Sequence, residues 1–284
     1  MLGRLIKYEW KNTAKVCGSL LLFMGIMTVL GCVSFCTPLW SGVFKGEGSS
    51  PMIFLGIMFL VLYVVSLIGV IYGILIYLGV HFYKSMYSDE GYLTHTLPVT
   101  SHHLLVSKIL VSALWYLIVM VLMFVSLVSI VLTVIHLILA AEGRSFWAEL
   151  SDNWDFFVMG VESVMGEGIL KQILFYILQI VVAAFSSVMM LFGAITVGQL
   201  SSRHKVMMSI VSYFGITILL QIVASIVTVP VTFYSTQAIM ESAEVSVNLT
   251  TMPTFLVTIA MNLIFAVVLY FISNFIITRK LNLD

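Results

Sequence analysis

The chain alternates between long apolar runs and short polar segments. Six apolar runs lie near residues 17–37, 52–82, 106–141, 170–198, 207–230 and 253–277. Each is long enough to cross the hydrocarbon of a bilayer, which takes roughly 20 helical residues. Their central parts hold no Asp, Glu, Lys or Arg and show no strand-like alternation, so helices are the spanning structure that satisfies the backbone. The pattern predicts an all-α membrane protein, with residues 1–284 forming a single transmembrane domain of six helices.

The first 15 residues have a different, amphipathic pattern. On a helix, the apolar face carries Leu2, Leu5, Ile6 and Trp10, and another face carries Lys7, Lys11 and Lys15. A helix of this kind lies in the headgroup plane of a bilayer. We therefore expect residues 1–15 to form an interfacial helix ahead of the first span; the alternative is a basic flank that only sets topology. The following apolar run is too long for a signal peptide and no cleavage site follows it.

Composition supports the membrane assignment. Hydrophobic residues make up 61% of the chain, charged residues 9%, and the mean hydropathy is +1.13. Soluble domains carry about 25% charged residues, so most of this chain must face lipid or other helices. The net charge is zero, which gives no reason to expect nucleic acid as a partner. The three cysteines lie in one segment and do not form a disulfide framework.

The distribution of basic residues predicts the orientation. With the N-terminus in the cytoplasm, ten Lys and Arg residues fall on the inside and three on the outside. The acids of residues 142–169, Glu142, Glu149, Asp152, Asp155, Glu162 and Glu167, then lie in one external loop. Aromatic residues in that loop fit either a membrane-seated cap or an aromatic belt. We expect both termini and residues 83–105 to be cytoplasmic.

Few residues in the apolar runs offer chemistry. Gln179, Gln221 and Asn262 are amides within predicted spans, where they can hydrogen-bond between helices or contact a substrate along a pathway. Gly69 and Gly73 form a G-x-x-x-G pattern that lets a neighbouring helix approach closely. The chain has no G-x-x-x-x-G-K-[ST], H-E-x-x-H or G-x-S-x-G motif, which excludes a P-loop and the commonest metalloprotease and serine hydrolase signatures. Adjacent His102 and His103 suit one metal ion poorly, so we expect no metal site.

The polar segment between the second and third runs is the most elaborate one. Asp89, Glu90 and Gly91 can open a turn, Pro98 can stop a helix, and Ser101 can cap the next one. Tyr92, Leu93 and Leu97 supply an apolar side. The residues alone fit two interpretations equally: a docking surface for a soluble partner, or a solvated loop whose acids avoid an anionic membrane surface.

Three places in the chain resemble one family. In residues 83–108, an aromatic residue is followed by Tyr-x-Asp-Glu-Gly-Tyr-Leu and then by Leu-Pro-Val and Lys. This segment resembles the cytoplasmic loop of ABC-2 type transporter permeases, residues 194–205 resemble their tight turn between helices four and five, and residues 5–9 resemble their interfacial helix. The layout of six spans with both ends inside covers the whole chain, whereas sequence-level likeness is confined to these three places.

The resemblance implies a partner and a docking site. It implies that residues 84–103 are a coupling loop that docks on an ATP-binding subunit. The docking residues would be Tyr87, Asp89, Glu90, Gly91, Tyr92, Leu93, Leu97 and Pro98. The chain would itself be neither an enzyme nor a cofactor protein, because ATP and Mg would be bound by that subunit.

The resulting hypothesis is a permease subunit in the bacterial cytoplasmic membrane. Two copies of this chain, or this chain and a homologous one, would work with two ATP-binding subunits and export a hydrophobic or amphipathic peptide, lipid or drug by alternating access. One alternative is an ATP-independent carrier or channel, which would need a selectivity feature or a coupling residue on a helix. The other is an intramembrane enzyme, whose candidate cluster is His81, His95, His102 and His103.

Overall fold

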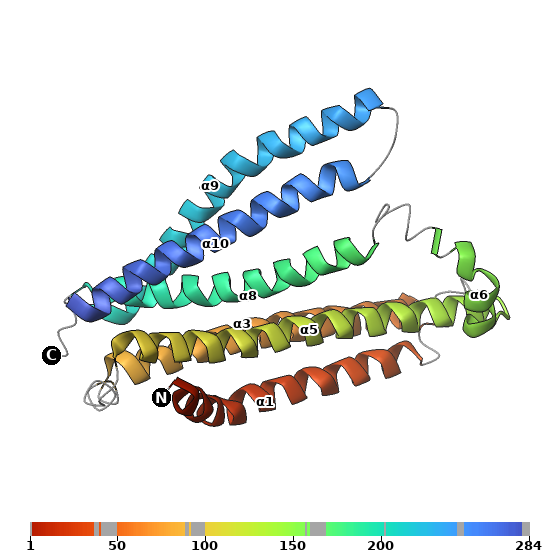
Figure 1. Ribbon diagram of the computed structural model, residues 1–284. Coiled ribbons are helices and arrows are strands. Elements are labelled where there is room, and N and C mark those ends of the chain that lie inside the picture. The colour runs from red at the N-terminus through yellow and green to blue at the C-terminus, as the bar shows by residue number, and fades with distance from the viewer. Residues whose placement is uncertain are drawn as a thin grey trace. The chain divides into compact units, whose positions relative to one another are not determined.

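In the computed structural model, the regular structure of the described residues is entirely helical (Figure 1). The structure describes residues 2–36, 40, 50–88, 91, 100–156, 158–159, 169–201, 203–242 and 247–279. The helices are α1 (Leu2–Phe35), α3 (Ser50–Tyr87), α5 (Ser101–Ala141), α6 (Phe146–Asp152), α8 (Ile169–Gly198), α9 (Lys205–Ser242) and α10 (Val247–Arg279). All but the short α6 are long and apolar enough to cross a membrane. The predicted all-α membrane fold with six spanning helices is confirmed.

The helices extend beyond the predicted spans at several ends. α3 continues to Tyr87 and α5 begins at Ser101, so the connection between them is shorter than residues 84–103. α9 continues through Pro230, and α10 begins before Pro253. Proline is tolerated inside apolar spanning helices because neighbouring groups satisfy the freed backbone positions.

α1 combines the two helices that the sequence predicts at the N-terminus. It runs without interruption from Leu2 to Phe35. No Gly or Pro lies between Arg4 and Val16, and Ala14 and Lys15 at the expected break are strong helix formers. The amphipathic segment is therefore the first part of a longer helix.

The chain divides into two compact units. The first unit contains Met1–Thr13, Leu75–Leu117 and Val161–Asp284, and the second contains Ala14–Ile74 and Ile118–Gly160. Helices α1, α3 and α5 each contribute one part to each unit. The single transmembrane domain expected from the sequence stays a prediction.

In the second unit, parts of α1, α3 and α5 meet at small and hydroxyl side chains. The hydroxyls of Thr28 and Ser126 lie 2.7 Å apart, and the Tyr63 hydroxyl also hydrogen-bonds Ser126. Beside them Gly31 faces Ile130, which would lie 3.1 Å from a Cβ at that position. Small residues and interhelical hydrogen bonds are the usual basis of helix packing in membranes.

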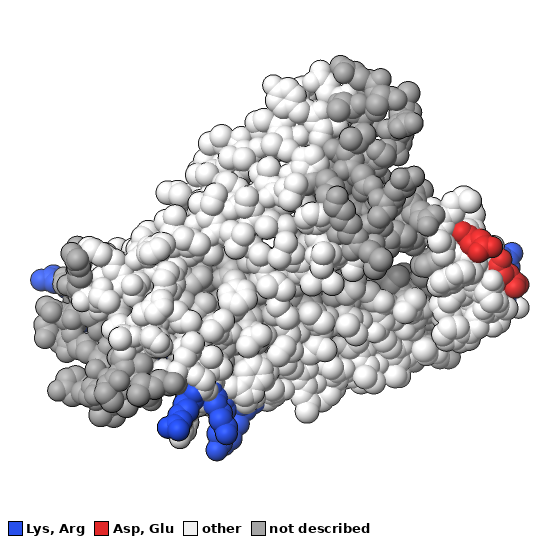
Figure 2. Space-filling model, viewed as in Figure 1, with Lys and Arg blue, Asp and Glu red and all other residues white. Residues whose placement is uncertain are grey.

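The second unit also carries the acidic segment around α6. Gly143, with φ of 74°, follows the end of α5, and the Arg144 guanidinium lies 3.2 Å from the Glu149 carboxylate. Figure 2 shows acidic side chains gathered over α6. Trp147 and Phe156 are 74% and 76% exposed, which suits contact with a membrane interface.

In the first unit, α8, α9 and α10 pack against one another. α8 and α10 run in the same direction and α9 runs back (Figure 1). α8 approaches α10 at Gly193, where a Cβ would lie 3.1 Å from Leu269. It approaches α9 at Gly198, where a Cβ would lie only 2.4 Å from the Ser209 Cα. These glycines set the close packing of the three helices.

Candidate functional site

The junction between α3 and α5 lies wholly in the first unit and flanks the predicted coupling loop. Of the predicted docking residues, the structure describes Tyr87 and Gly91. The others, Asp89, Glu90, Tyr92, Leu93, Leu97 and Pro98, lie outside the described residues.

Gly91 occupies a restricted position next to the end of α3. Its amide donates a hydrogen bond to the Ser88 carbonyl at 2.7 Å, as in a turn. A Cβ at Gly91 would lie 2.6 Å from the carbonyl carbon and oxygen of Met86. The chain can therefore turn back on α3 here only because residue 91 lacks a side chain.

Tyr87 ties the end of α3 to α8. Its hydroxyl lies 2.9 Å from that of Thr196, which is fully buried. One turn earlier the rings of Phe82 and Phe192 stack with centroids 3.9 Å apart. At Gly79 a Cβ would contact Leu191 at 3.2 Å. The last three turns of α3 thus lie directly against α8.

A charged cluster joins α1, α3 and α5. The Glu9 Oε1 accepts hydrogen bonds from His81 Nε2 at 2.7 Å and from Lys108 Nζ at 3.0 Å. The three side chains are between 6% and 16% exposed. A buried ammonium needs a counter-charge, because desolvation without one costs several kcal/mol. One carboxylate oxygen therefore fixes three helices at the same point.

Aromatic packing reinforces the same contact between α1 and α5. The rings of Trp10 and Trp115 stack with centroids 4.3 Å apart. The Trp115 indole donates a hydrogen bond to the Thr13 hydroxyl at 2.9 Å. Thr13 in turn donates to the Glu9 carbonyl at 2.9 Å. The face of α1 that carries Glu9 and Thr13 therefore packs against α3 and α5.

The predicted amphipathic pattern of α1 matches the distribution of exposure. Leu2, Leu5, Ile6 and Trp10 are half-buried, whereas Lys7 and Lys11 are exposed. Figure 2 shows basic side chains over the first turns of α1. Part of the apolar face contacts the protein itself, through Trp10, and the interfacial location stays a prediction.

The histidines that the enzyme hypothesis needs have separate partners. His81 binds Glu9, the Tyr270 hydroxyl hydrogen-bonds His102, and the Thr100 hydroxyl lies 2.6 Å from His103 Nδ1. His95 lies outside the described residues. Within the described ranges, no group of three or more His, Cys, Asp and Glu side chains could hold a metal ion.

The predicted packing glycines on α3 face open space. A Cβ at Gly69 or Gly73 would meet no heavy atom of the described chain within 4 Å. Their neighbours Tyr72 and Ile76 are 57% and 64% exposed. A close approach of another helix at this pattern stays a prediction.

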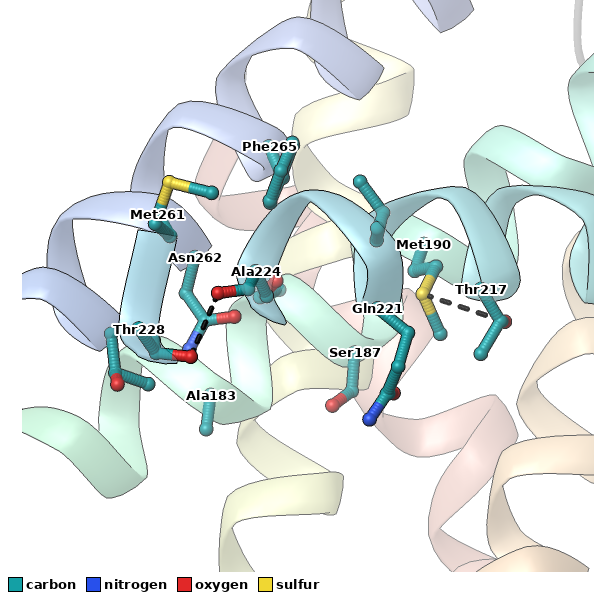
Figure 3. A pocket seen from close by; sticks show the side chains of 13 residues that line it. Ala183, Ser187, Met190, Thr217, Gln221, Ala224, Thr228, Met261, Asn262 and Phe265 are labelled. Atoms are coloured by element: carbon teal, nitrogen blue, oxygen red, sulfur yellow. Dashed lines mark hydrogen bonds between the residues drawn. The ribbon is translucent and has the colours of Figure 1, made fainter. Parts of the chain in front are cut away.

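Two of the three predicted pathway amides share a groove. A hollow of about 280 Å³ lies between the middle parts of α8, α9 and α10 (Figure 3). Its polar lining consists of Ser186, Ser187, Thr217, Gln221, Thr228, Thr258 and Asn262. Gln179 of α8 is not among the lining residues, and its side-chain oxygen is buried without a hydrogen-bond partner.

Sequence reasoning missed Glu9, Lys108, Thr196 and Gly198 as site residues. Glu9 carries a local signal, since it is the single acid among the basic residues of the first 15 and lies four residues before Thr13. Its partners are 72 and 99 residues away, and no spacing rule joins such positions.

Comparison with known proteins leaves the chain without a match. No protein-family model, no curated protein and no solved structure matches it.

Proposed function

We propose that this chain is the membrane-spanning permease subunit of an ATP-driven transporter of the ABC-2 type. In this proposal the segment between α3 and α5 docks a separate ATP-binding subunit. The observation that carries the proposal is the Glu9–His81–Lys108 cluster at the base of that segment.

The cluster makes the junction suitable for transmitting force. His81 lies six residues before the end of α3, and Lys108 lies seven residues after the start of α5. Both bind one oxygen of Glu9, so a load on the connecting segment reaches three helices together. Tyr87 and Phe82 pass the same displacement to α8. A solvated loop without a partner would not need such a base.

The sequence supports an external source of energy. The chain has no P-loop motif and no charged residue in the central parts of its apolar runs. An ATPase of the P-loop class needs that motif, and ion-coupled carriers usually need a charged residue in the middle of a span. An ATP-binding partner meets this requirement, and it would hold the ATP and Mg.

The mechanism follows from the two-fold layout of such transporters. Two copies of this chain, or this chain and a homologue, form the pathway in the bacterial plasma membrane, with both termini and the docking segments in the cytoplasm. Nucleotide binding brings the two ATP-binding subunits together and favours one state of the pathway through its higher affinity for that state. The direction we propose is export, and the cargo is hydrophobic or amphipathic.

Co-purification tests the docking. The wild-type chain is expressed with a candidate ATP-binding subunit and compared with a variant in which Asp89, Glu90, Tyr92 and Leu93 are replaced by alanine. We expect a complex with the wild type and loss of the complex with the variant. The matched control replaces two acids and two aromatic residues elsewhere, Glu142, Asp152, Trp147 and Phe156, which are exposed in the second unit. The control variant should keep the complex.

Two results would count against this account. Failure of the wild type to bind the subunit would remove the ATP-driven function. If the variant of the α3–α5 segment binds the subunit as well as the wild type does, the protein is still a transporter subunit, but its docking site lies outside that segment.

A further inference from the structure

We propose that the groove between α8, α9 and α10 is a binding site for an uncharged amphipathic molecule whose head carries hydroxyl and ester groups, as in a neutral glyceride. This site does not depend on the transporter function, because the groove belongs to one chain and its occupancy can be measured without an ATP-binding subunit.

The groove lies deep within its three helices. Ser187, Gln221 and Asn262 lie in the middle parts of helices that are long and apolar enough to span a membrane. No water is available in the hydrocarbon core to satisfy a polar side chain. An amide left there without a partner costs several kcal/mol. A groove with this lining is therefore incomplete without an occupant.

The two amides of the groove have unused hydrogen-bonding groups. Gln221 is exposed and Asn262 half-buried, and neither side-chain amide makes a hydrogen bond to another described residue. Figure 3 shows Gln221 projecting from α9 toward the side of Ser187 on α8, and Asn262 projecting from α10 toward Thr228 on α9. Each amide offers two donors and one acceptor oxygen to the hollow.

The threonine hydroxyls of the groove donate to backbone carbonyls. Thr217, Thr228 and Thr258 donate to the carbonyls four residues earlier, at 2.7–2.8 Å. The donors of Thr228 and Thr258 are thus used within their own helices, whereas the Thr217 hydroxyl also lies 3.8 Å from the Met190 sulfur on α8. The oxygens of all three remain as acceptors. The lining therefore matches a head group that has hydroxyls to donate to these oxygens and carbonyls to accept from the amides.

The absence of charge and the apolar residues of the lining indicate an uncharged head group and an apolar tail. No charged residue lines the groove, so it offers no counter-charge to an ionised head group. Met190, Met261 and Phe265 supply soft apolar contacts. A hollow of about 280 Å³ accommodates a head group and its first carbons, and the rest of an acyl chain can lie along the exposed helix faces.

Photolabelling tests the site. The purified chain in vesicles is irradiated with a monoacylglycerol that carries a diazirine in its acyl chain, and the adducts are located by mass spectrometry. We expect adducts on the lining segments of α8, α9 and α10, competed by unlabelled monoacylglycerol. The ionised fatty acid with the same diazirine should label these segments much less.

Matched variants link the labelling to the amides. Gln221→Leu combined with Asn262→Leu should lower the adduct yield about tenfold, as expected for two lost hydrogen bonds. Gln179→Leu makes the same change on α8 outside the groove and should leave the yield unchanged. Ala224→Phe, which fills the hollow and keeps both amides, should also abolish the labelling.

The proposal is overturned if the probe labels no lining segment, or if the labelling is the same in the double variant and in Ala224→Phe as in the wild type. It is also overturned if the fatty acid labels the groove as well as the monoacylglycerol does. None of these results would bear on whether an ATP-binding subunit docks at the α3–α5 segment.

Discussion

At the scale of single residues, Glu9 joins three helices through one carboxylate oxygen. Among the described residues, its carboxylate is the ion-pair partner of the Lys108 ammonium, which is 6% exposed. The sequence places a single acid among the basic residues of this segment, but only the tertiary packing brings His81 and Lys108 next to it. Local spacing therefore predicts the amphipathic helix and cannot predict the cluster.

Neutralising Glu9 should leave a buried cation unpaired. We expect Glu9→Gln to lower the free energy of unfolding by about 3 kcal/mol, as for other broken buried pairs. Adding Lys108→Met should restore most of it, because the cation is then removed as well. Denaturation in detergent micelles measures both, with Lys11→Met, an exposed position on α1, as the unchanged control. A double variant no more stable than Glu9→Gln would contradict the pairing.

Gly198 provides a second test at this scale. A Cβ there would lie 2.4 Å from the Ser209 Cα and 2.5 Å from its nitrogen, so the backbone would have to move. We expect Gly198→Ala to destabilise the protein by about 1–3 kcal/mol, as other overpacked sites do. Gly215→Ala, on α9 with nothing within 4 Å, should be neutral or stabilising, because alanine favours helix. Equal melting temperatures for the two variants would show that α8 and α9 do not meet as described.

At the scale of elements, the apolar runs predict where the helices lie. They predict the ends of the helices less well. Lys84 and Tyr87 read as loop residues in the sequence, yet α3 continues through them because its last turns pack on α8. Pro230 reads as the end of a span, yet it lies inside α9. Helix ends are set by what the last turn contacts, and that information is not local.

We predict that two copies of the chain pair through the open face of α3. A Cβ at Gly69 or Gly73 would meet no heavy atom of the described residues within 4 Å, so we expect a second copy of the chain to approach at this face. Gly69→Leu combined with Gly73→Leu should abolish self-association, because bulky side chains keep two helices apart. Single-molecule photobleaching of labelled chains in vesicles counts the copies. Gly25→Leu, on α1 with equally open surroundings, should leave the expected self-association unchanged, and self-association that survives the double substitution would exclude this face.

At the scale of the whole molecule, the number of spanning helices and their all-α character follow from hydrophobicity alone, since the bilayer restricts the possible spanning structures. The groove itself could not be predicted from the sequence, and a substrate contact of its amides stays a prediction. The sequence singled out Gln179, Gln221 and Asn262 together, and only the packing of three helices separates the first from the other two. The orientation in the membrane and the docking role of the α3–α5 segment remain predictions from charge distribution and resemblance.

The central claim is that residues between α3 and α5 contact an ATP-binding subunit, and site-specific photo-crosslinking in cells tests it most directly. A photoreactive amino acid replaces Leu93, and the crosslinked protein is identified by mass spectrometry, with the same amino acid at Trp147 as the control. We predict an adduct from position 93 alone, to a protein that carries a P-loop motif. An adduct to a protein without such a motif, or no protein adduct from position 93, would contradict the account.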